Sequence, residues 1–233
     1  MMKAYCITIH GNEISEKGYE NLVESSRNVG NDFEIEKFPA THGQYSDIVL
    51  KGKGLEWKYP WEGQRQDIAS GLTLTAYETK TKENRIGCFL SHYNCWEDCL
   101  AYEEPILVLE HDAFFTKKLD YDYILESKYD IVGINDPRGC TRKSKIYYDI
   151  IRERKQDIQP VPRIDAWNIP QGLAGNSAYI IKPNGAQNME YMAKAHGAWP
   201  NDALMCYQLV ANLGVTKQHY TTVQRLPSTT TSI

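Results

Sequence analysis

Two acidic residues stand directly after the most hydrophobic short run of the chain. Glu110 and Asp112 follow residues 106–109, whose aliphatic run after Pro105 predicts a buried strand. On an extended backbone, side chains two positions apart point to the same side, and His111 between them is expected to face away. Two buried carboxylates are costly unless a cation or a ligand compensates them, and magnesium and manganese prefer oxygen ligands. The pair predicts a divalent-metal site; the alternative is a solvated acidic turn that closes the strand.

Strand and helix patterns alternate along the chain on both sides of this acidic pair. They predict strands over residues 4–9, 33–38, 106–109, 130–134 and 178–181, and helices over 16–27, 85–100, 184–195 and 203–212. Residues 41–78 have weak periodicity, which predicts a long, partly helical insertion. The order indicates an α/β fold with a doubly wound, mostly parallel, Rossmann-like sheet flanked by helices. Such sheets bind ligands at the carboxyl ends of their strands.

Length, charge and hydropathy narrow the class of protein. A chain of 233 residues fits one domain, residues 1–233, and a net charge of −4 gives no overall basic footprint for nucleic acid. No apolar run is long enough for a membrane span and no cleavable signal is visible, so we expect a cytoplasmic protein, or one of the host cytoplasm if it is viral. Six cysteines lack any C-x-x-C pair. Cys88, Cys95 and Cys99 share one helical face, which predicts reduced, buried thiols rather than a zinc site.

Five short segments resemble the motifs of one enzyme family, in that family's order. They are 40–43 (ATHG), 85–92 (RIGCFLSH), 106–113 (ILVLEHDA), 175–182 (GNSAYIIK) and 200–202 (PND). They are similar to motifs of glycosyltransferase family 25, which includes lipo-oligosaccharide and collagen galactosyltransferases. Two departures stand out: His111 replaces the usual middle Asp, and residues 10–12 replace an Asn-Leu and an Arg that follow the family's first strand.

The resemblance implies a GT-A fold, with residues 1–113 as the nucleotide-sugar half and 114–233 as the acceptor half. It also implies a hexosyl- or pentosyltransferase that depends on manganese or magnesium and takes a nucleotide-sugar donor, expected to be a UDP-sugar. The implied metal ligands are Glu110, Asp112 and His219, although a lone His in a strand-like segment is more commonly a surface or satisfied residue. The implied donor contacts are Ile9, His10, Arg85, Glu110, Asp112, Gly172 and Asn176.

The family resemblance also suggests a catalytic base. Asp202 stands where the family keeps a Pro-x-Asp before a helix, and a carboxylate there would suit transfer with inversion. Its alternative role is to cap that helix or to complement its dipole. Arg85 is open to a second interpretation as a solvated residue at a helix start, and Gly172 as part of a plain turn. We expect Ser91 and His92 to fix local packing.

One basic stretch bears on the acceptor. Residues 138–155 contain seven Lys or Arg against Asp149 and Glu153. This is either a solvated helix or an anion-facing acceptor site, for which the candidates are Arg142, Lys143, Lys145 and Tyr147. We expect a saccharide acceptor of the lipopolysaccharide type. The alternatives are a bacteriophage-type enzyme that glycosylates a hydroxymethylated DNA base, and a non-catalytic carbohydrate-binding relative in which His111 marks a lost metal site.

Overall fold

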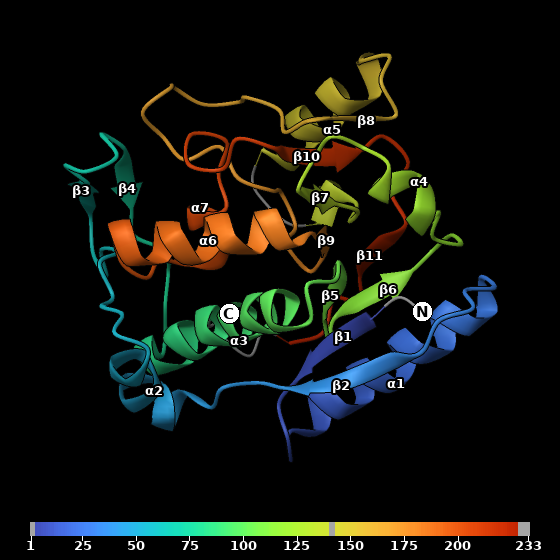
Figure 1. Ribbon diagram of the computed structural model, residues 1–233, viewed down its shortest axis with the longest axis horizontal. Helices are drawn as coiled ribbons and strands as arrows, with labels where there is room; N and C mark the ends of the chain where they lie inside the picture. Colours follow the sequence, from blue (N-terminus) through green and yellow to red (C-terminus); the bar gives the residue numbers. More distant parts are fainter. Residues whose placement is uncertain (1–2, 140–142, 228–233) are drawn as a thin grey trace.

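The computed structural model describes residues 3–139 and 143–227, and the predicted acceptor residue Arg142 lies outside them. A seven-stranded sheet forms the centre of the molecule, in the order β2-β1-β5-β9-β7-β10-β8 (Figure 1). Its strands are β1 (Lys3–Thr8), β2 (Ile35–Pro39), β5 (Ile106–Glu110), β7 (Ile131–Gly133), β8 (Ile158–Pro160), β9 (Ala178–Ile181) and β10 (Leu213–Thr216). Five of them run in one direction, while β9 and β8 run in the other. The predicted α/β class with a mainly parallel sheet is confirmed.

Helices cover both faces of this sheet. On one face lie α3 (Lys82–Tyr102) and α6 (Pro183–His196), which pack side by side in Figure 1. On the other face lies α1 (Glu13–Asn28), together with a small second sheet of β6 (Ala113–Phe115) and β11 (Thr221–Val223). Strand β5 is buried on both sides because its alternate residues enter two separate cores: Ile106 and Val108 join the α3 core, and Leu107 and Leu109 join the α1 core.

The remaining elements are short. The chain between β2 and α3 forms a 3-10 turn (Gly43–Tyr45), α2 (Ser46–Gly52) and a hairpin of β3 (Gln64–Gln66) and β4 (Thr73–Thr75), so the predicted partly helical insertion is confirmed. Beyond β6 lie α4 (Tyr121–Leu125), a 3-10 turn (Pro137–Gly139) and α5 (Ser144–Glu153). None of the described helices is both long and apolar enough to cross a membrane.

The predicted helix over residues 203–212 is wrong. The observed α7 (Asn201–Leu204) is a single turn. Cys206 then forms an isolated antiparallel bridge with Gly172, and the backbone N–H of Tyr207 donates to the Gln171 carbonyl at 3.0 Å. Tertiary pairing with residues 171–172 therefore takes the backbone groups that a longer helix would have used.

Candidate functional site

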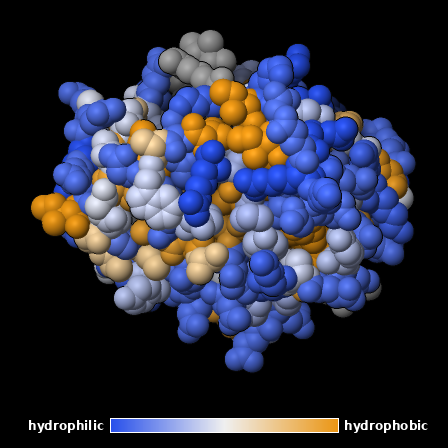
Figure 2. All heavy atoms as spheres, turned by 90° about the horizontal axis from the view of Figure 1, so that it is seen from above, coloured by the Kyte–Doolittle hydropathy of each residue, from blue (hydrophilic) through white to orange (hydrophobic). Residues whose placement is uncertain are grey.

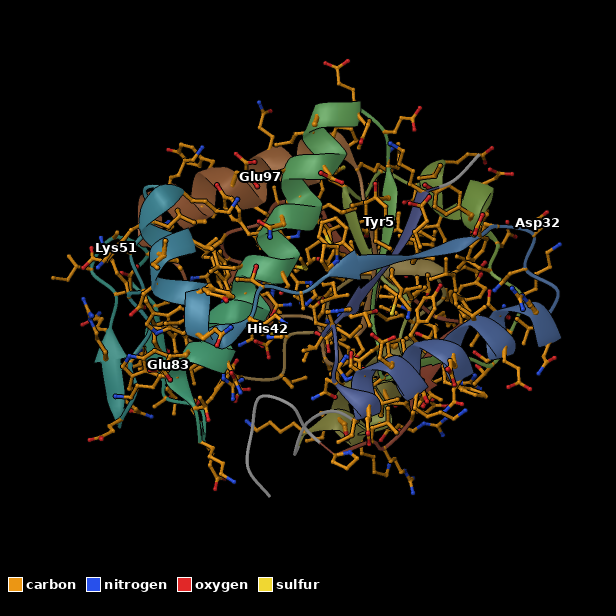
Figure 3. All side chains as sticks on the ribbon, turned by 90° about the horizontal axis from the view of Figure 1, so that it is seen from below. Tyr5, Asp32, His42, Lys51, Glu83 and Glu97 are labelled. Carbon is orange, nitrogen blue, oxygen red and sulfur yellow. The ribbon has the colours of Figure 1, made fainter. Side chains whose placement is uncertain are left out.

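A cavity of about 570 Å³ opens at the carboxyl ends of β1 and β5, where an α/β sheet binds its ligands. Five segments line it: the β1–α1 connection with Ile9 and His10, the loop over residues 40–43, the first turns of α3, residues 110–112 at the end of β5, and residues 226–227. In Figure 3, His42 lies where the chain leads from β2 toward α2, and Asp32 lies toward the opposite end of β2.

Two small residues allow the 40–43 loop to lie against α3. A Cβ on Gly87 would come within 2.5 Å of the Thr41 carbonyl oxygen, and a Cβ on Gly43 would collide with the Asn84 side chain. Ser91 then holds the loop, since its hydroxyl accepts from the Thr41 N–H at 2.9 Å while donating to the Gly87 carbonyl. The predicted packing role of Ser91 is confirmed.

His92 ties α3 to the first of the two carboxylates. Its Nε2 lies 3.0 Å from Glu110 Oε1, and its Nδ1 lies 2.9 Å from the hydroxyl of Tyr179, which also accepts from Trp96 Nε1 at 2.9 Å. If Tyr179 donates to Nδ1, the Nε2–H of a neutral His92 donates to Glu110. Burial alone would raise the pKa of Glu110, but the hydrogen bond with His92 and the nearby imidazoles lower it below its usual value. His92 thus has a role at the site beyond the packing expected from the sequence.

The pKa of Asp112 is shifted in the opposite direction to that of Glu110. Burial first, and the charge of Glu110 second, raise its pKa to about 7. Its buried Oδ1 atom has no hydrogen-bond partner among the described residues. Glu110 is the last residue of β5 and faces α3 as Ile106 and Val108 do, whereas residues 111–112 form a turn that brings Asp112 to the cavity. For the same reason His111, predicted to face away, also lines the cavity.

Asn176 and Ser177 form the turn directly before β9, and Ser177 contacts the acidic pair. Asn176 is only 8% exposed, and neither its Oδ1 nor its Nδ2 has a hydrogen-bond partner within the described part of the chain. Two unpartnered amide atoms at one buried side chain indicate a place for a ligand. Ser177 helps to lower the pKa of both carboxyls, and its carbonyl accepts from the Glu110 N–H at 2.8 Å. Sequence reasoning missed Ser177, although it stands inside the 175–182 motif.

Asp202 and Arg85 form a second group beside this cavity. The Tyr77 hydroxyl approaches Asp202 Oδ2 at 3.4 Å, and the Arg85 guanidinium stacks over the Tyr77 ring at 5.3 Å. Burial raises the pKa of Asp202, Arg85 opposes that rise, and Glu110 adds to it. Pro200 occupies the N-cap position of α7, so Asp202 is not the cap residue. Gly172 lies directly against the Asp202 backbone carbonyl, which leaves no room for a side chain there.

His219 is not brought together with the acidic pair. The antiparallel register of β11 and β6 places Val223 opposite Ala113, and the Gln224 N–H donates to the Asp112 carbonyl at 2.7 Å. His219 precedes β11 in the chain, and its ring centroid lies 5.6 Å from that of Tyr148. Among the described residues, Glu110, Asp112 and His219 do not form a group whose ligand atoms all lie within 4.8 Å of one another.

The contacts of the basic segment near α5 favour the solvated helix, one of its two predicted interpretations. Tyr147, a predicted acceptor contact, is 2% exposed and belongs to the core, so that prediction is wrong. Lys143 is paired with Asp165, and Lys145 with Asp149 at 2.6 Å. Figure 2 shows the side on which Figure 1 places α5 as predominantly hydrophilic, with hydrophobic residues gathered in limited areas. Helix α5 is amphipathic: Tyr147 and Ile151 lie on its buried face, and Lys145 and Asp149 are exposed to solvent.

The cysteines divide into two groups. None of the five described cysteines forms a disulfide, and Cys6, Cys95, Cys99 and Cys206 are buried. The prediction of reduced core thiols is confirmed for Cys95 and Cys99. Cys88 is only partly buried and lines the cavity, so for it the core prediction is wrong.

The fold and the site define an α/β protein with an acidic cavity at the carboxyl ends of its parallel strands. Residues 50–205 match the family model of glycosyltransferase family 25, described as LPS biosynthesis protein, and the chain belongs to this family. Membership supports a transferase, with a nucleotide-sugar and an acceptor as its partners. A comparison with curated proteins gave no match.

Proposed function

We propose that this protein is a metal-dependent glycosyltransferase of GT-A type that moves a hexosyl or pentosyl group from a UDP-sugar to a hydroxyl of a lipopolysaccharide-type saccharide. One observation carries the proposal. Two carboxylates, Glu110 and Asp112, line one cavity, and a buried oxygen of Asp112 has no partner among the described residues. The central antiparallel strand β9, which Asn176 and Ser177 directly precede, is compatible with a sheet shared by donor and acceptor halves.

The donor would bind in the cavity with its diphosphate near two helix starts. Asn12 caps α1 through its side chain, which accepts from the Ser15 N–H at 3.0 Å, and Asn84 lies in the first turn of α3. Both residues line the cavity. The partial positive charge at the N-terminus of a helix favours an anion, and here two long helices contribute it together. Ile9 and His10 would lie along the nucleoside.

The acidic pair suits a divalent cation. His92 bonds to Oε1 of Glu110, and Asp112 presents an Oδ1 that has no partner among the described residues, so the pair offers a carboxylate oxygen to an ion. Carboxylate oxygens are the ligands that magnesium and manganese prefer, and the residues therefore fit such an ion. When bound, the ion would supply positive charge that stabilises the departing diphosphate. His219 is left out of this ligand set.

Asp202 is our proposed base. Its buried carboxyl, whose pKa lies above the usual value, is suited to receive a proton from an acceptor hydroxyl. The Tyr77 hydroxyl and the Arg85 guanidinium would orient it. A direct proton transfer to Asp202 accompanies displacement at the sugar carbon, and the configuration of that carbon inverts.

A saccharide acceptor has more support than a DNA base. Three of the basic side chains that would hold phosphates already pair with carboxylates of this chain: Lys143 with Asp165, Lys145 with Asp149, and Arg138 with Asp136 at 2.6 Å. The retained acidic pair likewise favours a catalytic protein over a carbohydrate-binding relative that has lost its metal site.

The test is hydrolysis or transfer from a UDP-sugar panel with and without manganese. We expect Glu110→Gln and Asp112→Asn to lower the manganese-stimulated rate by about 100-fold or more, because both remove charge that would hold the ion. Asp32→Asn is the matched control, because Asp32 is exposed and lies away from the cavity (Figure 3). Rates in the two cavity variants that equal the control rate would refute the proposal.

A further inference from the structure

A second set of ligand atoms lies in the same cavity. Cys88 Sγ, an imidazole nitrogen of His92 and a carboxylate oxygen of Glu110 all lie within 4.8 Å of one another. Cys88 and His92 are one helical turn apart on α3, so the helix presents them on one side, and Glu110 meets them from the end of β5. Neither Cys88 nor His92 has a part in the donor and base roles described above.

The spacing suits a small ion with tetrahedral geometry. With Zn–S of about 2.3 Å and Zn–N of about 2.0 Å, neighbouring ligand atoms would be roughly 3.5 Å apart. His92 Nε2 and Glu110 Oε1 are 3.0 Å apart, so small side-chain rotations are enough. Three protein ligands would leave a fourth position open toward the cavity.

The orientation of the His92 imidazole is also fixed by a hydrogen bond at its other nitrogen, Nδ1. A histidine that binds a metal commonly gives its other ring nitrogen to a hydrogen-bond partner that fixes the ring. Here the Tyr179 hydroxyl lies 2.9 Å from His92 Nδ1. The Tyr179 ring also stacks on the imidazole, with the two ring centroids 5.7 Å apart. Trp96 fixes the Tyr179 hydroxyl in turn. His92 is 1% exposed, so the packed core sets the direction in which Nε2 points.

We propose that Cys88, His92 and Glu110 form a binding site for a zinc-class divalent cation, distinct in chemistry from the oxygen site of Glu110 and Asp112. Thiolate and imidazole ligands select zinc or cobalt, whereas the acidic pair selects manganese or magnesium. Binding breaks the S–H bond of Cys88, forms a metal–sulfur bond and releases the proton to solvent. Because Glu110 belongs to both sites, zinc would compete with the activating ion, a consequence that rests on the proposed function.

Cobalt(II) tests the binding site itself, without any sugar donor. Wild-type protein titrated with cobalt should develop the near-ultraviolet charge-transfer absorption of a cobalt–thiolate bond. Cys88→Ser should abolish it. Cys95→Ser, a change at a buried cysteine on the same helix, should retain it. Tyr179→Phe removes the hydroxyl that orients His92 and should weaken cobalt binding by about 10-fold.

Two further measurements keep the outcomes apart. Asp112→Asn should retain the cobalt absorption while losing manganese stimulation, so the zinc-class site and the proposed function can fail independently. In wild-type protein, zinc should slow alkylation of Cys88 by iodoacetamide, read by peptide mass mapping, which needs no variant to fold. Absence of the absorption, its persistence in Cys88→Ser, or alkylation of Cys88 unaffected by zinc would overturn the proposal.

Discussion

The cavity and the α5 segment both carry charged residues that the sequence predicts to bind a ligand. The two regions differ in whether those charges are paired within the protein. Around α5, cations and carboxylates neutralise one another, as in the pairs Lys143–Asp165 and Lys145–Asp149. In the cavity, Asp112 has a buried oxygen without a partner among the described residues, close to the charge of Glu110. A ligand can compensate groups of the second kind, whereas groups of the first kind are already compensated.

The charged cluster to regard as a ligand site is therefore the one in the cavity, and not the ion pairs around α5. Exposed ion pairs add little stability and offer little to a ligand. Buried polar atoms without partners cost folding free energy, and a protein retains them where a function requires them. Asn176, with both amide atoms unpartnered among the described residues, is a candidate ligand contact for the same reason.

The largest expected effect separates a carboxylate beside the cavity from one beside α5. Asp202→Asn should lower kcat for sugar transfer by about 100- to 10,000-fold, the usual contribution of a general base. Asp165→Asn, which breaks only the pair with Lys143, should leave kcat within about twofold. Steady-state kinetics on the best donor and acceptor would measure both. Equal losses in the two variants would remove the distinction between the regions.

An intermediate effect is expected in the pH dependence of stability of the metal-free protein. The usual pKa of Asp112 is 3.8 and its folded pKa is about 7, so the native state keeps a proton that the unfolded chain releases. Stability should therefore fall as the pH rises from about 4 to about 7. Asp112→Asn should remove this fall and gain about 1–3 kcal/mol at pH 8.

Asp136, beside α5, should show the opposite sign. Although burial alone would raise its pKa, the bonds from Arg138 lower it, so its contribution is present above pH 4 and is lost as the pH falls through the lower folded pKa. Asp136→Asn should destabilise the protein at neutral pH. Urea unfolding of the three proteins with a chelator present, from pH 3 to pH 8, measures both slopes. Parallel slopes for Asp112→Asn and wild type would contradict the account.

The smallest effect concerns the basic side chains themselves. Lys145→Gln should change the free energy of unfolding by no more than about 0.5 kcal/mol, because its partner Asp149 is one helical turn away on an exposed face. Lys143→Gln should change the free energy of unfolding by a similarly small amount. If either change abolished salt-sensitive binding of duplex DNA, measured by fluorescence anisotropy, the α5 segment would be a ligand site after all.

The sequence predicted best where one element determines its own pattern. The buried run of β5, the stripe of α3 and the helical pattern over residues 184–195 gave elements whose existence and type are confirmed. The helix over 203–212 failed because pairing of Cys206 with Gly172 depends on a chain segment some thirty residues away. Local periodicity contains no information about such a pairing.

The candidate site could be predicted in part for the same reason. Glu110 and Asp112 were found because strand ends are visible in a sequence, although the turn after Glu110, and not strand alternation, brings Asp112 to the cavity. The contacts of His92 with Glu110 and Tyr179 connect α3 with β5 and β9. Cys88 comes close to Glu110 only because α3 packs on the sheet. The 85–92 motif marked these residues, but their partners required the fold.

Donor binding to the cavity through the acidic pair is the central claim, and thermal unfolding tests it most directly. A ligand that binds only the native state raises Tm by mass action. With manganese present, one UDP-sugar of a panel should raise the Tm of wild-type protein by several degrees, and the same donor should raise the Tm of Asp112→Asn much less. If no donor shifts the wild-type Tm, or if Asp112→Asn shifts as much as wild type with manganese, the claim is contradicted.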